Sequence, residues 1–325
     1  MIVRLFKNLS DTRWFAAILL LFVLFIPFNY IFSLHEYSHT LLTNLHISSW
    51  FIYQQTPINT ISIIVLTIAA AIFFHHVLIN NKLTSAKNFT GLLFTVILIV
   101  VWHPILVSYL HFFTLALVLF GLFRLLFFDE SPNPLLQIFD SAFLISLAVI
   151  LNIFLIPLIL LPFVALIHFR DFNLRTWVAA ITGIILPILF LNTADYLLND
   201  QITFFTLISD SLALISTSFI HLKAYPYHWI GAGLVVVPAI IKTLSKTREK
   251  KIAIRKQTTL LIWFFILSFS ISLFENAPID IIIYLIAFPA GFFISSSLYF
   301  LHEKKLFAIL IDLGCIALIV FHSFF

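Results

Sequence analysis

The stretch SKTREKKIAIRKQ, residues Ser245 to Gln257, stands between two apolar segments, Tyr227 to Leu244 and Thr258 to Phe274. Each flanking segment has about the length that an α-helix needs to cross a membrane. Lys and Arg residues collect in the cytoplasmic loops of membrane proteins. This basic run therefore predicts a cytoplasmic turn between two transmembrane helices, and it sets the orientation of the whole chain.

The composition supports a membrane protein. Of the 325 residues, 62% are hydrophobic and only 10% are charged, which leaves too little polar surface to cover a water-facing exterior. The formal net charge of +4 does not indicate nucleic-acid binding, because the basic residues lie in short clusters beside apolar segments. The single cysteine, Cys315, allows no intramolecular disulfide. We expect one polytopic, all-α membrane domain over residues 1–325 and no nucleic-acid partner.

Alternation of apolar segments and basic connections predicts the topology. With the amino terminus in the cytoplasm, all of the 18 Lys and Arg residues except Lys223 fall on the cytoplasmic side. The expected helices cover residues 14–34, 58–79, two spans within 89–128, a hairpin within 135–169, and then 177–198, 227–244, 258–274, 281–300 and 306–320. The total is about eleven transmembrane helices, as in a multi-pass protein of the bacterial inner membrane.

The segment 135–169 allows two arrangements. It is apolar and is interrupted by Asp140, Asn152, Pro157 and Pro162. Two crossings fit this length only tightly. A re-entrant hairpin that bends between Asn152 and Pro157 keeps the same parity, since irregular backbone is tolerated where protein or a water-filled cavity covers it.

The residue content also predicts how the helices pack. The chain has 39 phenylalanines and only 7 glycines. Closely approached membrane helices typically carry small residues four positions apart. We therefore expect the helices to pack through bulky side chains.

The first connection on the outer face contains HEYSH, residues 35–39. On a helix, His35 and His39 would share one face beside Glu36, as in zinc hydrolases of the H-E-x-x-H type. The pattern fixes only three residues and leaves the third zinc ligand unidentified. A zinc hydrolase is therefore one alternative, and interfacial histidines without metal are the other.

Glu36 also suits a different chemistry. Membrane glycosyltransferases that use polyprenyl-phosphate carriers typically place an acidic residue just after the first transmembrane helix on the outer face, and this chain is similar. A carboxylate there acts as a base toward an acceptor hydroxyl or helps to hold a divalent cation. Asp195 and Asp200 are its candidate catalytic partners. Candidate residues for binding a phosphate or a sugar ring are His221, Lys223, Tyr225, Tyr227 and His228.

The best specific hypothesis is an envelope enzyme that acts on a polyprenyl-lipid-linked substrate at the outer face. A transporter would instead use a cavity near mid-membrane, lined by the break between Asn152 and Pro157 and by Asp312. A membrane partner in an envelope assembly would expose an apolar flank to another protein. The basic run acts as a topology anchor or binds anionic lipid headgroups.

Two further stretches carry a family resemblance. They are FGLFRLLFFDESPNPLLQIFDSAFLISLA, Phe120 to Ala148, and FRDFNLRTWVAAITGIILP, Phe169 to Pro187. Both stretches lie in a region, residues 58–198, that resembles a family of uncharacterised multi-pass inner-membrane proteins of the Bacteroidota. That family is a domain of unknown function that is sometimes mislabelled as a carotene oxygenase. The resemblance implies a multi-pass topology and an envelope location, and it assigns no role to any residue.

Overall fold

The computed structural model describes residues 57–83, 90–102, 109–128, 132–199, 226–247, 250–274 and 277–299. Within these ranges the chain is helical and contains no strand. The elements are α4 (Pro57–Asn80), α5 (Thr90–Trp102), α6 (Tyr109–Leu126), α7 (Pro134–Leu151), the 3₁₀-helix η3 (Ile153–Ile159), α8 (Leu160–Phe169), α9 (Leu174–Asn199), α12 (Pro226–Thr247), α13 (Ile252–Ile271) and α14 (Ile279–Tyr299). The all-α prediction is confirmed for this part of the chain.

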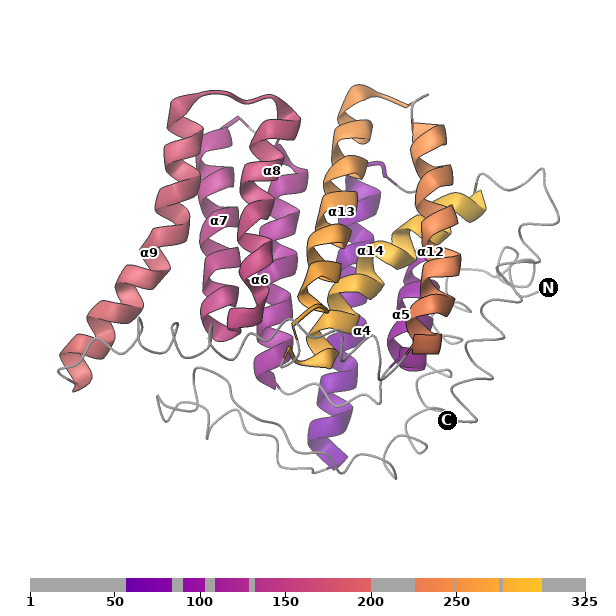
Figure 1. The fold of residues 1–325 in the computed structure, drawn as a ribbon, viewed down its shortest axis with the longest axis horizontal. Coiled ribbons are helices and arrows are strands. Elements are labelled where there is room, and N and C mark those ends of the chain that lie inside the picture. Colours follow the sequence, from indigo (N-terminus) through magenta and orange to yellow (C-terminus); the bar gives the residue numbers. More distant parts are fainter. Residues whose placement is uncertain are drawn as a thin grey trace.

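The helices form a bundle in which the chain reverses direction from one helix to the next, except that η3 continues directly into α8 (Figure 1). The links that follow α6, α8 and α12 lie at the top of the view. The end of α4 lies there too, because Gln257 of α13 makes hydrogen bonds to the ends of both α4 and α6. We call this end of the bundle the basic end, because it carries every Lys and Arg that the structure describes. These are Lys82, Arg124, Arg170, Arg175, Lys242, Lys246, Lys250, Lys251, Arg255 and Lys256.

Three of the described helices are long and apolar enough to cross a membrane, namely Pro134–Leu151, Leu174–Thr193 and Ile252–Ile271. Shorter apolar stretches lie at Leu66–Asn80, His111–Leu126, Ile153–Phe169 and Ile281–Ser297. Large apolar side chains also remain exposed, including Leu189 and Phe190 of α9, at 54% and 63%. An exposed apolar surface of this kind fits a lipid environment. The chain is therefore a membrane-associated helical protein.

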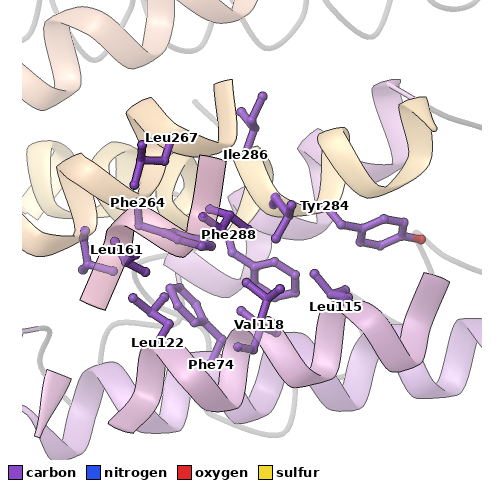
Figure 2. Packing of buried hydrophobic residues seen from close by; sticks show 14 of the residues in the cluster. Phe74, Leu115, Val118, Leu122, Leu161, Phe264, Leu267, Tyr284, Ile286 and Phe288 are labelled. Carbon is purple, nitrogen blue, oxygen red and sulfur yellow. The ribbon is translucent and has the colours of Figure 1, made fainter. Parts of the chain in front are cut away.

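Bulky side chains fill the centre of the bundle, as the phenylalanine content predicts. Phe264 of α13 and Phe288 of α14 are fully buried, and both lie in the cluster that Figure 2 shows beside Leu122 and Val118 of α6. Phe74 of α4 meets Phe288 edge to face, with 5.3 Å between the ring centroids. Edge-to-face rings at this distance add about 0.5–1.5 kcal/mol to the burial of apolar area.

Small residues nevertheless make close helix crossings, so the expectation against them was wrong. A Cβ atom placed on Gly291 of α14 would lie 2.8 Å from the backbone nitrogen of Thr95 and 2.9 Å from the carbonyl oxygen of Gly91, both in α5. Gly183 of α9 approaches α7 in the same way, because its added Cβ would lie 2.7 Å from the carbonyl oxygen of Phe139. Few glycines suffice when each one lies at a crossing.

The break within residues 135–169 lies at Asn152. This residue is extended (φ −147°, ψ 103°), and its side-chain oxygen caps the start of η3 by accepting a hydrogen bond of 3.2 Å from the backbone nitrogen of Phe154. Element η3 and α8 then run back to the basic end (Figure 1). From the rise per residue, α7 is about 27 Å long and η3 with α8 about 29 Å, close to the ~30 Å of a hydrocarbon core. The segment 135–169 thus forms two antiparallel arms of similar length that meet at Asn152.

Candidate functional site

Most residues of the predicted outer-face site lie outside the described residues. This holds for Glu36, for Asp200, for the HEYSH histidines His35 and His39, and for the candidate substrate residues His221, Lys223 and Tyr225. Asp195 lies in α9, whereas Tyr227 and His228 lie in the first turn of α12. The side chains of these three residues are not among those described. The chemistry assigned to the outer face therefore stays a prediction.

The described helices do place the backbone that leads into that predicted site. Helix α9 ends at Asn199 and α12 begins at Pro226, and both of these ends lie opposite the basic end. They lie on opposite flanks of the bundle, at the far left and the right of Figure 1. Helices α9 and α12 consequently do not bring Asp195 beside Tyr227 or His228.

Metal binding has no candidate in the described part of the chain. No group of three or more His, Cys, Asp or Glu side chains there could hold a metal ion. The HEYSH segment lies outside the described residues. The zinc alternative at residues 35–39 thus stays a prediction.

A buried hydrogen-bond network joins three helices at the basic end. The Nε2 atom of Gln257 donates to the Oδ1 atom of Asn81, at 3.0 Å, and to the carbonyl oxygen of Leu126, at 2.9 Å. Asn81 in turn donates from Nδ2 to the carbonyl oxygen of Val77, at 2.9 Å. We call these groups the amide network. Because a buried polar group without its partner costs about 1–3 kcal/mol, the network holds the ends of α4, α6 and α13 together.

Gln257 belongs to α13, because this helix begins before the position that the sequence predicts. We expected the helix to start at Thr258, and it starts at Ile252. The segment IAIRKQ therefore forms the first part of α13. The basic run is not a loop throughout, because its beginning belongs to α12 and its end belongs to α13. One feature of the sequence could have indicated a buried polar residue here. Gln257 is uncharged, and it lies at the end of the basic run directly before an apolar segment.

A cation and aromatic rings connect α13 to α8 beside the amide network. The Nζ atom of Lys256 lies 5.5 Å from the centroid of the Phe169 ring. Phe128, just after α6, also contacts Phe169, with 5.4 Å between the ring centroids. A Lys ammonium over an aromatic face adds about 0.5–1 kcal/mol at an exposed site. These contacts assign a structural role to this part of the basic end.

The second stretch that carries the family resemblance forms the turn between α8 and α9. Arg170 has a left-handed backbone (φ 59°) and ends α8. The side chain of Asn173 accepts a hydrogen bond of 3.1 Å from the nitrogen of Arg175, and the Nε1 atom of Trp177 donates to the carbonyl oxygen of Asp171 at 3.1 Å. These residues shape a tight helix–turn–helix connection, since side-chain caps satisfy otherwise unpaired backbone groups.

The first stretch that carries the resemblance packs α6 against α7. Arg124 in the last turn of α6 pairs with Asp140 of α7, with 3.1 Å between Nη2 and Oδ2. Gly121 permits close contact, because a Cβ there would lie 2.9 Å from Ile145. The ion pair is partly exposed and contributes at most about 1 kcal/mol. This stretch too has a structural role.

No protein-family model, no curated protein and no solved structure matches the chain. The resemblance to the Bacteroidota family therefore stays a prediction. What the described residues establish is a helical membrane-associated bundle with a positively charged end and an apolar centre.

Proposed function

We propose that the chain is a multi-pass protein of the bacterial inner membrane, with its amino terminus and its basic end in the cytoplasm. The observation that carries this proposal is the position of the described Lys and Arg residues, all of which lie at one end of the bundle. A soluble protein would not segregate its cations in this way, whereas insertion into a membrane does so by keeping them on the cytoplasmic side. The alternating helix directions support repeated crossings.

Reporter fusions test the orientation. Green fluorescent protein, which is fluorescent only in the cytoplasm, and alkaline phosphatase, which is active only outside it, are fused in turn after residues 249 and 199. We expect fluorescence but no phosphatase activity after residue 249, and the reverse after residue 199. The opposite pattern at both positions would overturn the proposed orientation.

For the molecular function, we propose an enzyme that acts on a polyprenyl-lipid-linked substrate at the outer face, with Glu36 as the acid or base. The support from the bundle is positional. The end of α9 and the start of α12, which lead into the predicted site, both lie opposite the basic end. Since these ends lie on opposite flanks, Glu36 would work either with Asp195 and Asp200 or with the residues around His228, and not with both helix ends at once. A divalent cation could assist the carboxylates.

Glycosyl transfer from a polyprenyl-phosphate-linked sugar to the hydroxyl group of an added sugar acceptor, with release of the polyprenyl phosphate, tests this function in vesicles that contain the purified chain. We expect Glu36→Gln to lower the rate by about 10²–10⁴-fold, the usual contribution of a general acid or base. Glu275→Gln, at another predicted outer connection, is the matched control and should leave the rate unchanged. Equal rates for the wild type and Glu36→Gln would exclude this role. Metal analysis tests the zinc alternative, which requires about one zinc ion per chain.

A second candidate function, that of a membrane partner in an envelope assembly, would use an exposed apolar flank such as that of α9. This helix packs on one side against α7, where Ser146 donates a hydrogen bond of 2.7 Å to the carbonyl oxygen of Ile184. Its other side exposes Leu189 and Phe190. A photo-crosslinking residue at position 189 should capture one discrete protein, whereas the same residue in place of the exposed Ile241 of α12 should capture only lipid. Identical products at both positions would contradict a specific partner.

The transporter alternative gains no comparable support. The break at Asn152 lies at the end of α7 rather than in its middle, and the Asn152 side chain is engaged with the nitrogen of Phe154. The neighbouring residues Ile153, Phe154 and Leu155 are buried in the core. A transport site would need this break to face a cavity near mid-membrane.

A further inference from the structure

The turn between α12 and α13 combines exposed cations with an exposed apolar side chain. Lys251 and Arg255 are exposed at the start of α13, and Ile252 between them is 63% exposed. The turn lies at the top of the bundle in Figure 1. Contact with water alone would favour exposure of the cations but not exposure of the isoleucine side chain. The pattern instead fits a lipid–water interface, where charged heads meet phosphate and apolar side chains meet acyl chains.

The turn between α8 and α9 at the same end repeats this pattern. Arg170 and Arg175 are exposed, and so are Phe172 at 73% and Leu174 at 78%. Two separate turns of one end thus present cations interleaved with large apolar groups. A soluble polyanion such as nucleic acid would gain little from the apolar groups, whereas a membrane surface gains from both.

Few acids oppose this positive charge in the described part of the chain. The described acidic side chains at this end are Asp140, which pairs with Arg124, and Asp171, whose Oδ1 atom accepts a hydrogen bond from the nitrogen of Asn173. Helix α13 also begins without a side-chain cap and without an acidic residue in its first turn. Its positive helix end adds to the attraction for an anion. Among the described residues, positive charge therefore predominates around Lys251 and Arg255.

We propose that the start of α13, residues Lys251 to Arg255, binds the headgroup phosphate of an anionic phospholipid in the cytoplasmic leaflet. Lys251 and Arg255 contact the phosphate oxygens, and Ile252 lies against the upper part of the acyl chains. The proposed orientation of the chain determines only which leaflet supplies the lipid. It does not depend on any reaction at the outer face.

Native mass spectrometry of the detergent-purified full-length chain, titrated with phosphatidylglycerol or phosphatidylcholine, tests the proposal. We expect the wild type to bind phosphatidylglycerol more tightly, and Arg255→Gln to weaken that binding about five-fold, because one cation near an anionic surface contributes about 1 kcal/mol. Lys251→Gln/Arg255→Gln should weaken it about 25-fold. Because no bilayer is present, the assay is independent of the reporter fusions, so failure of the lipid site and failure of the orientation are distinguishable.

Two further variants separate a specific site from general charge. Lys82→Gln removes one exposed cation at the same end, where the neighbouring Asn81 and Leu83 are buried, and should change the affinity less than two-fold. Ile252→Ser keeps every charge and should weaken binding of phosphatidylglycerol but not of soluble glycerol phosphate. Equal affinity for the two lipids, or equal losses in Lys82→Gln and Arg255→Gln, would overturn the proposal. Unchanged elution and helicity show that each variant is folded.

Discussion

The side-chain nitrogen of Gln257 lies 3.0 Å from the side-chain oxygen of Asn81, although 176 positions separate the two residues in the chain. Gln257 is completely buried, so this bond forms away from water. A hydrogen bond in a medium of low dielectric constant is stronger than one in water, and its loss is correspondingly costly. The amide network therefore fixes the relative positions of α4 and α13 at the basic end.

Replacing Gln257 should destabilise the protein. Gln257→Leu keeps most of the volume but leaves the Oδ1 atom of Asn81 and the carbonyl oxygen of Leu126 without this donor. We expect the free energy of unfolding to fall by about 1–3 kcal/mol. Denaturation of the detergent-purified protein measures the change. Thr259→Ala, which removes a more exposed bond to the carbonyl oxygen of Arg255 on the same helix, should cost less than about 0.5 kcal/mol. Equal losses would contradict a special role for the network.

The crossing of α5 and α14 should tolerate no side chain at position 291. In Gly291→Ala the new Cβ would meet the side chain of Thr95 as well as the backbone of α5, so the helices must separate. We expect a loss of about 1–3 kcal/mol. Gly233→Ala in α12 is the matched control, because no atom lies within 4 Å of its added Cβ. That variant should be unchanged or more stable by up to about 1 kcal/mol, since alanine favours a helix.

Much of the fold follows from the sequence, because hydrophobic length and basic flanks are local properties. The segment expected at 58–79 is α4, Pro57–Asn80, and the one expected at 281–300 is α14, Ile279–Tyr299. The start of α13 at Ile252 was missed because Arg255 and Lys256 were taken as loop residues, although long charged side chains extend toward water from a helix end. Membrane helix ends are therefore less predictable than their apolar centres.

The packing partners could not be predicted. The contact between Gly291 and Thr95 depends on which helices adjoin, and no local pattern encodes that. The same holds for Asn81 and Gln257. For the predicted outer-face site, the sequence indicates which residue types lie on the same side of the membrane. Residues on the same side need not be close together, because α9 and α12 lie on opposite flanks of the bundle in Figure 1.

Stability should depend on the protonation of Lys250, which lies in the link between α12 and α13. Burial lowers the pKa of its ammonium group below the usual value of 10.5. Between the lowered pKa and 10.5, the unfolded chain binds more protons than the folded chain, so stability rises with pH in this window. Lys250→Gln should abolish that rise, whereas Lys251→Gln, at an exposed neighbour, should keep it. Denaturation midpoints across alkaline pH measure the effect, and parallel curves for the wild type and Lys250→Gln would contradict it.

The α8–α9 turn depends on both the ring and the N–H group of Trp177. The ring packs against Phe163, with 6.0 Å between the centroids, and Nε1 donates to the carbonyl oxygen of Asp171. Trp177→Phe keeps an aromatic ring and loses the bond, so we expect a loss of about 0.5–1.5 kcal/mol in the free energy of unfolding. Trp177→Ala loses both contacts and should cost more. Trp263→Phe, on the exposed face of α13, should change stability by less than about 0.5 kcal/mol. If Trp177→Phe were as mild as Trp263→Phe, the hydrogen bond would not contribute to the turn.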